Sequence, residues 1–171
     1  MRNYKNYPHF LGRAVYIRDA LKPSKGVVVL GGAIGYTNKY LDNFSINNIN
    51  FDTSIYCYNN KVCKNFETDV TKIKWNTYDW IISWNVLDCL NDNNVDVICN
   101  ALNNFNDEQL HIICCDGHIG SDRFKKSGYF IKTHEYWIEK LPKANLVCYD
   151  CRETIQGTVI KVPLSGKLVS E

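Results

Sequence analysis

The sequence predicts an α/β fold, in which a mostly parallel sheet is covered by helices on both faces. Short apolar runs alternate with segments of helical periodicity along the chain, a pattern typical of parallel strands joined by crossover helices. One run, Val27–Leu30, is apolar at every position, as in a strand buried on both faces. The last two apolar segments, 145–149 and 158–162, predict an antiparallel pair at one edge of the sheet.

The length and composition are those of one folded domain. The chain has 171 residues, 45% of them apolar and 22% charged, with a formal net charge of +2. This apolar content excludes a disordered chain, and the near balance of charge does not favour a nucleic-acid-binding protein. We therefore expect one domain over 1–171, with an N-terminal helical segment over 1–25 and an α/β core over 26–171.

The apolar runs and the cysteines indicate in which cellular compartment the protein is expected. No run approaches the roughly 20 apolar residues of a membrane span, and the first residues lead into no apolar stretch of the kind found in secretory signals. We therefore expect a cytoplasmic protein, no membrane partner, and free thiols at the eight cysteines. Cys148 and Cys151 have the spacing of zinc ligands, but a structural zinc site needs a second such pair. No metal is expected.

The first predicted elements surround the first strand. Apolar residues recur at helical spacing over 10–21 and predict a helix that ends at a Lys-Pro-Ser-Lys-Gly segment. After the strand of Val27–Leu30, a helix follows Gly35, with Thr37 or Asn38 as its N-cap.

The remaining elements continue the alternation. They are a weaker strand over 46–51, a short helix over 53–59, a strand over 62–66, a strand over 78–84, a helix over 95–105, a strand over 111–115 and a helix that Thr133 caps and Pro142 ends. Ligands of parallel sheets bind beyond the carboxyl ends of the strands. The loops after Leu30, Phe51, Ser83 and Cys115 are therefore where we expect the chemistry.

A glycine-rich loop, Gly31-Gly32-Ala33-Ile34-Gly35, joins the first strand to the next helix. Glycines let the backbone turn tightly and approach a ligand, and a helix start attracts negative charge. No Gly-Lys-Ser/Thr follows, which excludes a Walker loop. Ala33 also stands where a dinucleotide fingerprint has its second glycine. Taken alone, the loop fits a tight turn in any α/β protein equally well.

Two acidic residues follow the next two strands. Asp52 lies at the end of the second predicted strand, where a carboxylate can accept hydrogen bonds from both ribose hydroxyls of a nucleoside. Asp69 follows the third strand, where it can accept a hydrogen bond from an adenine amino group. Each residue alone is equally well explained as a helix-capping or turn aspartate. Trp84 can stack on adenine or on a flat acceptor, whereas Trp80 is expected in the core.

With these motifs, the sequence resembles the class I S-adenosylmethionine-dependent methyltransferases from about residue 27 to residue 117. Residues 27–36 look like the glycine-rich first motif of the family, and Phe51–Ser54 looks like its ribose-binding acidic motif. Thr68–Val70 is similar to the adenine-contacting motif, and Tyr78–Leu87 looks like the fourth motif. The resemblance implies a three-layer, Rossmann-like, seven-stranded fold, with S-adenosylmethionine as cofactor and S-adenosylhomocysteine as product.

The resemblance also implies which residues contact the cofactor. These are Gly31, Gly32, Ala33, Gly35, Asp52, Thr53, Asp69, Val70, Ser83 and Trp84. Two positions depart from the family pattern, because Val29 stands where the family usually has an acidic residue and Ala33 stands for the middle glycine. These departures motivate an alternative from another class, a non-catalytic methyltransferase-like subunit that binds a partner protein. A third alternative is an enzyme that cleaves the sulfonium cofactor on the same fold.

The candidate catalytic residues lie after the fourth and fifth predicted strands. Asp116 and His118 follow the fifth strand, and a histidine titrates near physiological pH; an ordinary loop histidine is the competing interpretation of His118. Asp88 either faces the acceptor or lies on a solvated helix end. Arg13 on the N-terminal helix can pair with a cofactor carboxylate, although an exposed arginine on a helix is the more common case.

The expected acceptor is a small molecule. Family members that methylate exocyclic amines of DNA bases usually carry a Pro-Pro-aromatic sequence after the fourth strand, whereas this chain has Ser83-Trp84-Asn85-Val86. No basic arm is present to bind a long polymer. A small-molecule acceptor, or recognition supplied by a partner subunit, is therefore favoured over nucleic acid.

Overall fold

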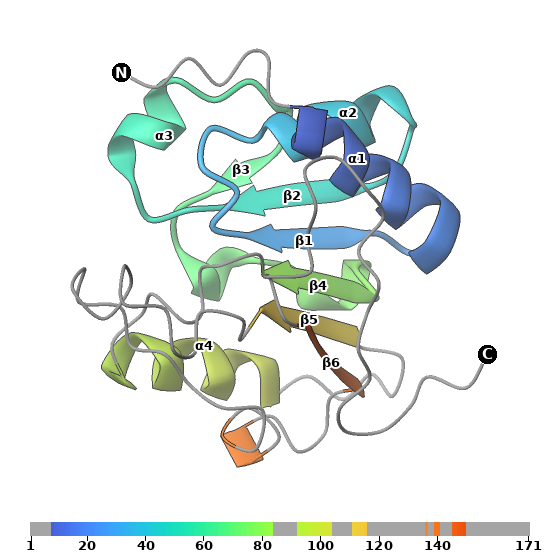
Figure 1. Ribbon diagram of the computed structural model, residues 1–171. Helices are drawn as coiled ribbons and strands as arrows, with labels where there is room; N and C mark the ends of the chain where they lie inside the picture. Colours follow the sequence, from blue (N-terminus) through green and yellow to red (C-terminus); the bar gives the residue numbers. More distant parts are fainter. Residues whose placement is uncertain are drawn as a thin grey trace, which may run out of the picture.

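A parallel sheet forms the centre of the molecule (Figure 1). The computed structural model describes residues 8–83, 92–103, 111–115, 136, 139–140 and 145–149. Its six strands are β1 (Val27–Leu30), β2 (Asn48–Phe51), β3 (Phe66–Glu67), β4 (Trp80–Ser83), β5 (His111–Cys115) and β6 (Asn145–Tyr149). They lie in the order β3-β2-β1-β4-β5-β6, and every neighbouring pair is parallel. The strand order therefore reverses between β1 and β4.

Helices cover both faces of this sheet, as predicted. They are α1 (Pro8–Tyr16) with a π-helical extension (Ile17–Leu21), α2 (Tyr36–Asn43), α3 (Ile55–Asn59) and α4 (Asp92–Asn103), with short 3₁₀ turns at Val70–Lys72 and Trp75–Thr77. Side chains alternate along β1. Val27 and Val29 pack with α1 and α2, whereas Val28 and Leu30 pack with α4 on the opposite face. The sheet is thus the middle layer between two apolar cores.

The N-terminus of α2 differs from the prediction. Gly35, at φ 87°, is its N-cap, and Thr37 and Asn38 lie inside the helix with both side chains buried. Asn38 Nδ2 donates to Asn48 Oδ1 on β2 over 2.9 Å. The side chain of Asn38 therefore faces the sheet, which explains why it does not cap the helix.

Strand β2 is shorter than predicted and carries polar side chains into the buried layer. Asn48 and Asn50 are 1% and 0% exposed, respectively. Asn48 Nδ2 donates to Asp42 Oδ1 on α2 over 2.9 Å, and Asn65 Nδ2 donates to the Asn48 carbonyl over 3.0 Å. A buried amide is tolerated when its polar atoms find partners, and α2 supplies them for Asn48.

The amino end of the sheet is held by one buried carboxylate. Asp79, directly before β4, is 5% exposed and accepts hydrogen bonds from the backbone N–H groups of Ser24, Lys25 and Gly26 and from the Ser24 hydroxyl, over 2.7 to 3.2 Å. Burial alone raises the pKa of the Asp79 carboxyl, but these four hydrogen bonds outweigh burial and hold the pKa below its ordinary value. Asp79 therefore fixes the turn that enters β1.

The C-terminal predictions are covered only in part. β6 pairs with β5 in parallel. The predicted strand over 158–162, and with it the antiparallel edge pair, lies outside the described residues, as do Thr133 and Pro142. Within the predicted helix between those two residues, residues 136 and 139–140 are helical. No helix in the described ranges combines the length and the apolar character needed to cross a membrane.

Candidate functional site

A cleft of about 320 Å³ opens at the carboxyl ends of β1, β2 and β3. It is lined by Leu30, Gly31, Phe51, Asp52, Thr53, Thr68, Asp69, Val70, Asn94, Val97 and Ile98. The strand ends supply the polar wall, and α4 supplies a mostly apolar wall. The cleft lies beside the reversal of strand order, where sheets of this kind bind ligands. Its volume is at the lower end of the roughly 300–1,000 Å³ of small-molecule sites.

The glycine-rich loop is held in place by the chain itself. Gly31 N donates to the Phe51 carbonyl over 2.6 Å, and Ala33 N donates to Asp52 Oδ2 over 3.1 Å. The Ala33 carbonyl accepts from Asn50 Nδ2 over 2.8 Å. These three bonds join the loop to β2 and to the residue after it. Ala33 adopts a left-handed conformation, with φ 51°, which is unfavourable for a residue with a side chain.

Two of the glycines are required by packing. A Cβ on Gly32 would overlap the Asn50 amide oxygen, and a Cβ on Gly35 would overlap the Cys63 sulfur. Gly35 also has φ 87°, in the region that glycine adopts most readily. Gly31 lines the cleft, but Gly35 does not. The structure thus explains Gly35 by contact with Cys63, a role that the sequence pattern does not reveal.

Asp52 connects the loop to helix α3. Besides accepting from Ala33, the carboxylate accepts from Ser54 N at Oδ1 over 2.9 Å. Ser54 is the N-cap of α3 and accepts in turn from Cys57 N. Each carboxylate oxygen has a second lone pair. Asp52 can therefore accept hydroxyl donors from a ligand in the cleft while it holds the loop.

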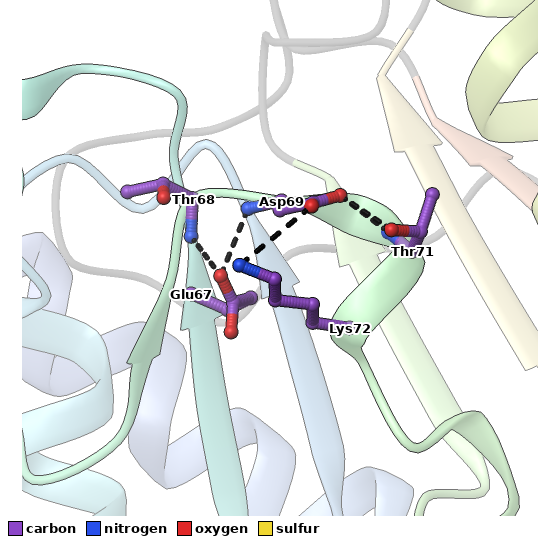
Figure 2. Close-up of polar contacts among 5 residues, drawn as sticks. All are labelled: Glu67, Thr68, Asp69, Thr71 and Lys72. Carbon is purple, nitrogen blue, oxygen red and sulfur yellow. Dashed lines mark hydrogen bonds and ion pairs between the residues drawn. The ribbon is translucent and has the colours of Figure 1, made fainter.

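Asp69 lies across the cleft in a network of short hydrogen bonds (Figure 2). Its Oδ1 accepts from Thr71 N over 3.0 Å and from Thr71 Oγ1 over 2.7 Å. Lys72 Nζ lies 3.9 Å from Oδ2. The hydrogen bonds from Thr71 hold the pKa of the Asp69 carboxyl below its ordinary value, and the positive charge of Lys72 makes a smaller contribution in the same direction. At neutral pH this carboxylate is ionised and acts only as an acceptor.

Glu67, at the end of β3, positions Asp69. Its Oε1 accepts from Thr68 N over 2.8 Å and from Asp69 N over 3.0 Å, as Figure 2 shows. Asp69 is also the N-cap of the 3₁₀ turn at Val70–Lys72. The capping role that the sequence left open is therefore confirmed, and the same residue lines the cleft.

The other predicted site residues fall into two groups. Thr53 and Val70 line the cleft, whereas Ser83 is 1% exposed at the end of β4 and is not among the lining residues. Trp80 is a core residue, as predicted. The remaining candidates lie outside the described residues and stay predictions: Trp84, Asp88, Asp116 and His118. Among the described side chains, no three His, Cys, Asp or Glu residues lie together as a metal site.

Sequence reasoning missed the wall that α4 contributes. Asn94 and Val97 line the cleft, and Val97 is 54% exposed. The apolar periodicity of this segment identified its buried face through Val95 and Ile98, but only Ile98 also reaches the cleft. A signal was present in Val97, an apolar residue off the buried stripe.

A second, smaller hollow of about 60 Å³ lies on the α1 side of the loop. It is lined by Phe10, Arg13, Val29, Leu30, Gly31, Gly32, Ala33 and Thr37. Leu30 and Gly31 line both spaces, so the cleft and the hollow adjoin at the end of β1. Arg13 is thus brought to the loop, as its helical position allowed. Comparison with models of known protein families and with curated proteins finds no match for this chain.

Proposed function

We propose that this protein binds S-adenosylmethionine and transfers its methyl group to a small acceptor. The observation that carries the proposal is the convergence of three distant segments, because Gly31, Asp52 and Asp69 line one cleft. The strand order supports it, since 3-2-1-4-5-6 is the order of doubly wound nucleotide-binding sheets. A Rossmann-like methyltransferase fold with a seventh strand belongs to this proposal.

The residues present fit an adenosine group. Asp52 keeps acceptor capacity for ribose hydroxyls, and Asp69 Oδ2 can accept from an adenine amino group. Val70, Val97 and Ile98 offer apolar contact to a flat ring. When bound, the cofactor supplies an electrophilic methyl group. This chain would hold cofactor and acceptor in line and exclude water between them.

Isothermal titration calorimetry tests the proposal. The wild-type protein should bind both S-adenosylmethionine and S-adenosylhomocysteine. Asp52→Asn and Asp69→Asn should each weaken binding by about tenfold, because each removes a charge-assisted acceptor. Asp19→Asn is the matched control, since Asp19 pairs with Arg18 on the N-terminal helical segment and does not line the cleft. Wild-type protein that gives no heat with either ligand, or that binds NAD in their place, overturns the proposal.

A second candidate function is favoured by helix α3. It has no buried residue, and Ile55, Tyr56 and Tyr58 are 65%, 53% and 41% exposed. An apolar face of this kind is typical of a surface that meets another protein, as in the alternative of a subunit that needs a partner. The discriminating assay measures methyl transfer to a panel of small acceptors, with and without fractionated cell protein. The partner-dependent function is supported if methyl transfer requires a protein fraction, and if Tyr56→Ser abolishes the stimulation by that fraction without altering cofactor binding.

A further inference from the structure

Helix α3 presents an exposed apolar surface beside the β3 edge of the sheet (Figure 1). Within the described residues five large apolar side chains are exposed, and three of them, Ile55, Tyr56 and Tyr58, lie on this five-residue helix. Single exposed apolar residues are ordinary, whereas a group of them marks a surface that meets another molecule. Together with Lys61 and Lys64, which follow the helix, these three residues are called the α3 surface below.

The α3 surface is positively charged. Between residues 53 and 66 the charged side chains are Lys61 and Lys64, both exposed, and none is acidic. The carboxylate of Asp42 contacts this segment, but its two oxygens already accept from Asn48 Nδ2 and from the Lys64 backbone N–H, over 2.9 and 3.0 Å. A partner with negative charge is therefore complementary. A second copy of the chain, docked through the same surface, would bring lysines against lysines.

The ring contacts of Tyr58 favour a protein partner over a nucleic acid. Lys61 Nζ lies 3.8 Å from the centre of the Tyr58 ring, and the Phe66 ring makes an edge contact with Tyr58 at 5.8 Å between ring centres. Single-stranded nucleic acids stack successive bases on open aromatic faces, but the ammonium group already covers one face of Tyr58. Ile55 and Tyr56 remain, and an aliphatic side chain beside a tyrosine suits apolar side chains of a protein.

Helix α3 is connected to the cleft through its N-cap. Asp52 Oδ1 accepts from Ser54 N over 2.9 Å, while Asp52 Oδ2 accepts from Ala33 N in the glycine-rich loop. Thr53 lines the cleft. A helix of five residues depends on packing for its stability, and α3 has no buried residue. A molecule that packs on α3 therefore orders the segment that positions Asp52.

We propose that the α3 surface binds an acidic protein segment that presents apolar side chains, and that this binding strengthens ligand binding in the cleft. The first half stands on the exposure and the charge of the α3 surface. The second half rests on the proposed function, because it acts through the Asp52 carboxylate that lines the cleft. Reciprocity then requires the ligand to strengthen binding of the acidic segment by the same factor.

Two peptide libraries test the first half. Both carry leucine, isoleucine and phenylalanine at random positions, and they differ only in whether the remaining positions are glutamate or lysine. The full-length protein should retain peptides from the glutamate library. The affinity of the tightest one, measured by fluorescence anisotropy, should fall as salt is added. Equal retention from both libraries, or from neither, overturns the proposal. Tighter binding of polyuridylic acid, or dimers in sedimentation that Tyr56→Ser abolishes, overturns it in favour of a nucleic acid or a second copy.

Variants assign peptide binding to the α3 surface. Tyr56→Ser should weaken the peptide by about tenfold. Lys61→Glu should weaken it by at least about threefold, because it places a negative charge against the acidic peptide. Leu11→Ser is the matched control for the apolar change, since Leu11 is 42% exposed on α1. Lys74→Glu is the matched control for the charge change, since Lys74 is exposed at the 3₁₀ turn of Trp75–Thr77. Wild-type peptide affinity in both surface variants overturns the proposal.

Calorimetry with S-adenosylhomocysteine, with and without a saturating amount of the glutamate peptide, tests the coupling. We expect each ligand to tighten binding of the other by about fivefold. An unchanged affinity for S-adenosylhomocysteine overturns the coupling and leaves the α3 surface in place. Absence of S-adenosylhomocysteine binding under both conditions overturns the proposed function, and the coupling with it, whatever the peptide does.

Discussion

Replacing Asp79 by Asn tests whether one carboxylate holds the amino end of the sheet. Four donors converge on this side chain: three backbone N–H groups and the Ser24 hydroxyl. In either orientation of the amide, its NH₂ group faces at least one backbone donor, which is then left buried without an acceptor. The other bonds lose the charge of the acceptor. These losses sum to about 2–3 kcal/mol of unfolding free energy at neutral pH.

The stability difference between the wild type and Asp79→Asn should depend on pH in a defined direction. The pKa of Asp79 is lower in the folded protein than its ordinary value. The carboxylate therefore contributes its full stabilisation above the unfolded pKa, near 4, and this contribution is lost as the pH falls through the folded pKa. The stability difference between the wild type and Asp79→Asn should be constant between pH 6 and 7 and should shrink below about pH 4.

Urea denaturation at each pH and thermal unfolding at pH 7, both followed by circular dichroism, measure the two effects. For a chain of this size, 2–3 kcal/mol corresponds to a melting temperature lower by roughly 5–10 °C. Ser24→Ala is a graded control, because it removes only the hydroxyl donor and should cost about 1 kcal/mol. A wild-type melting temperature for Asp79→Asn at pH 7, or a stability difference that is unchanged at pH 3, would refute the reasoning.

Three further predictions concern the loop and the thiols. Ala33→Gly should raise the unfolding free energy by about 0.5–1 kcal/mol, measured by urea denaturation, because glycine relieves the left-handed strain at φ 51°. Gly35→Ala should lower it by at least about 2 kcal/mol in the same assay, since its φ is 87° and its Cβ would overlap Cys63. Iodoacetamide at pH 8, with mass-spectrometric detection, should label half-buried Cys57 before the buried Cys63 and Cys99, because burial raises the pKa of each buried thiol to about 11.

The framework of the fold was predictable because it depends on local patterns. The uninterrupted apolar run Val27–Leu30 identified β1 with the bounds that the structure has. The placement of Asp52 and Asp69 at one cleft followed from the rule that parallel strands end at one edge. Local sequence patterns do not predict which side chains from different helices and strands pair with one another.

The failed details show this limit. Thr37 and Asn38 have good N-cap residue types, but the buried bond from Asn38 to Asn48 links two elements that the sequence does not place together. Glu67 orients Asp69 only because β3 ends two residues before Asp69, the N-cap of the 3₁₀ turn. The α4 wall likewise depends on how that helix lies across the sheet, which fixes Val97 at the cleft.

The asparagines of β2 have a consequence for strand alignment. Asn48 faces α2, where its amide finds partners, and Asn50 faces the loop, where its Nδ2 donates to the Ala33 carbonyl and its Oδ1 has no partner among the described residues. Ile49 and Phe51 face the apolar core on the α4 side. A slip of β2 by one residue would turn both amides into that core and direct Asp52 to the wrong side of the sheet. The two asparagines therefore specify the register of β2 in the sheet. Burying these polar groups costs stability, but it fixes a single position for the Asp52 carboxylate that lines the cleft.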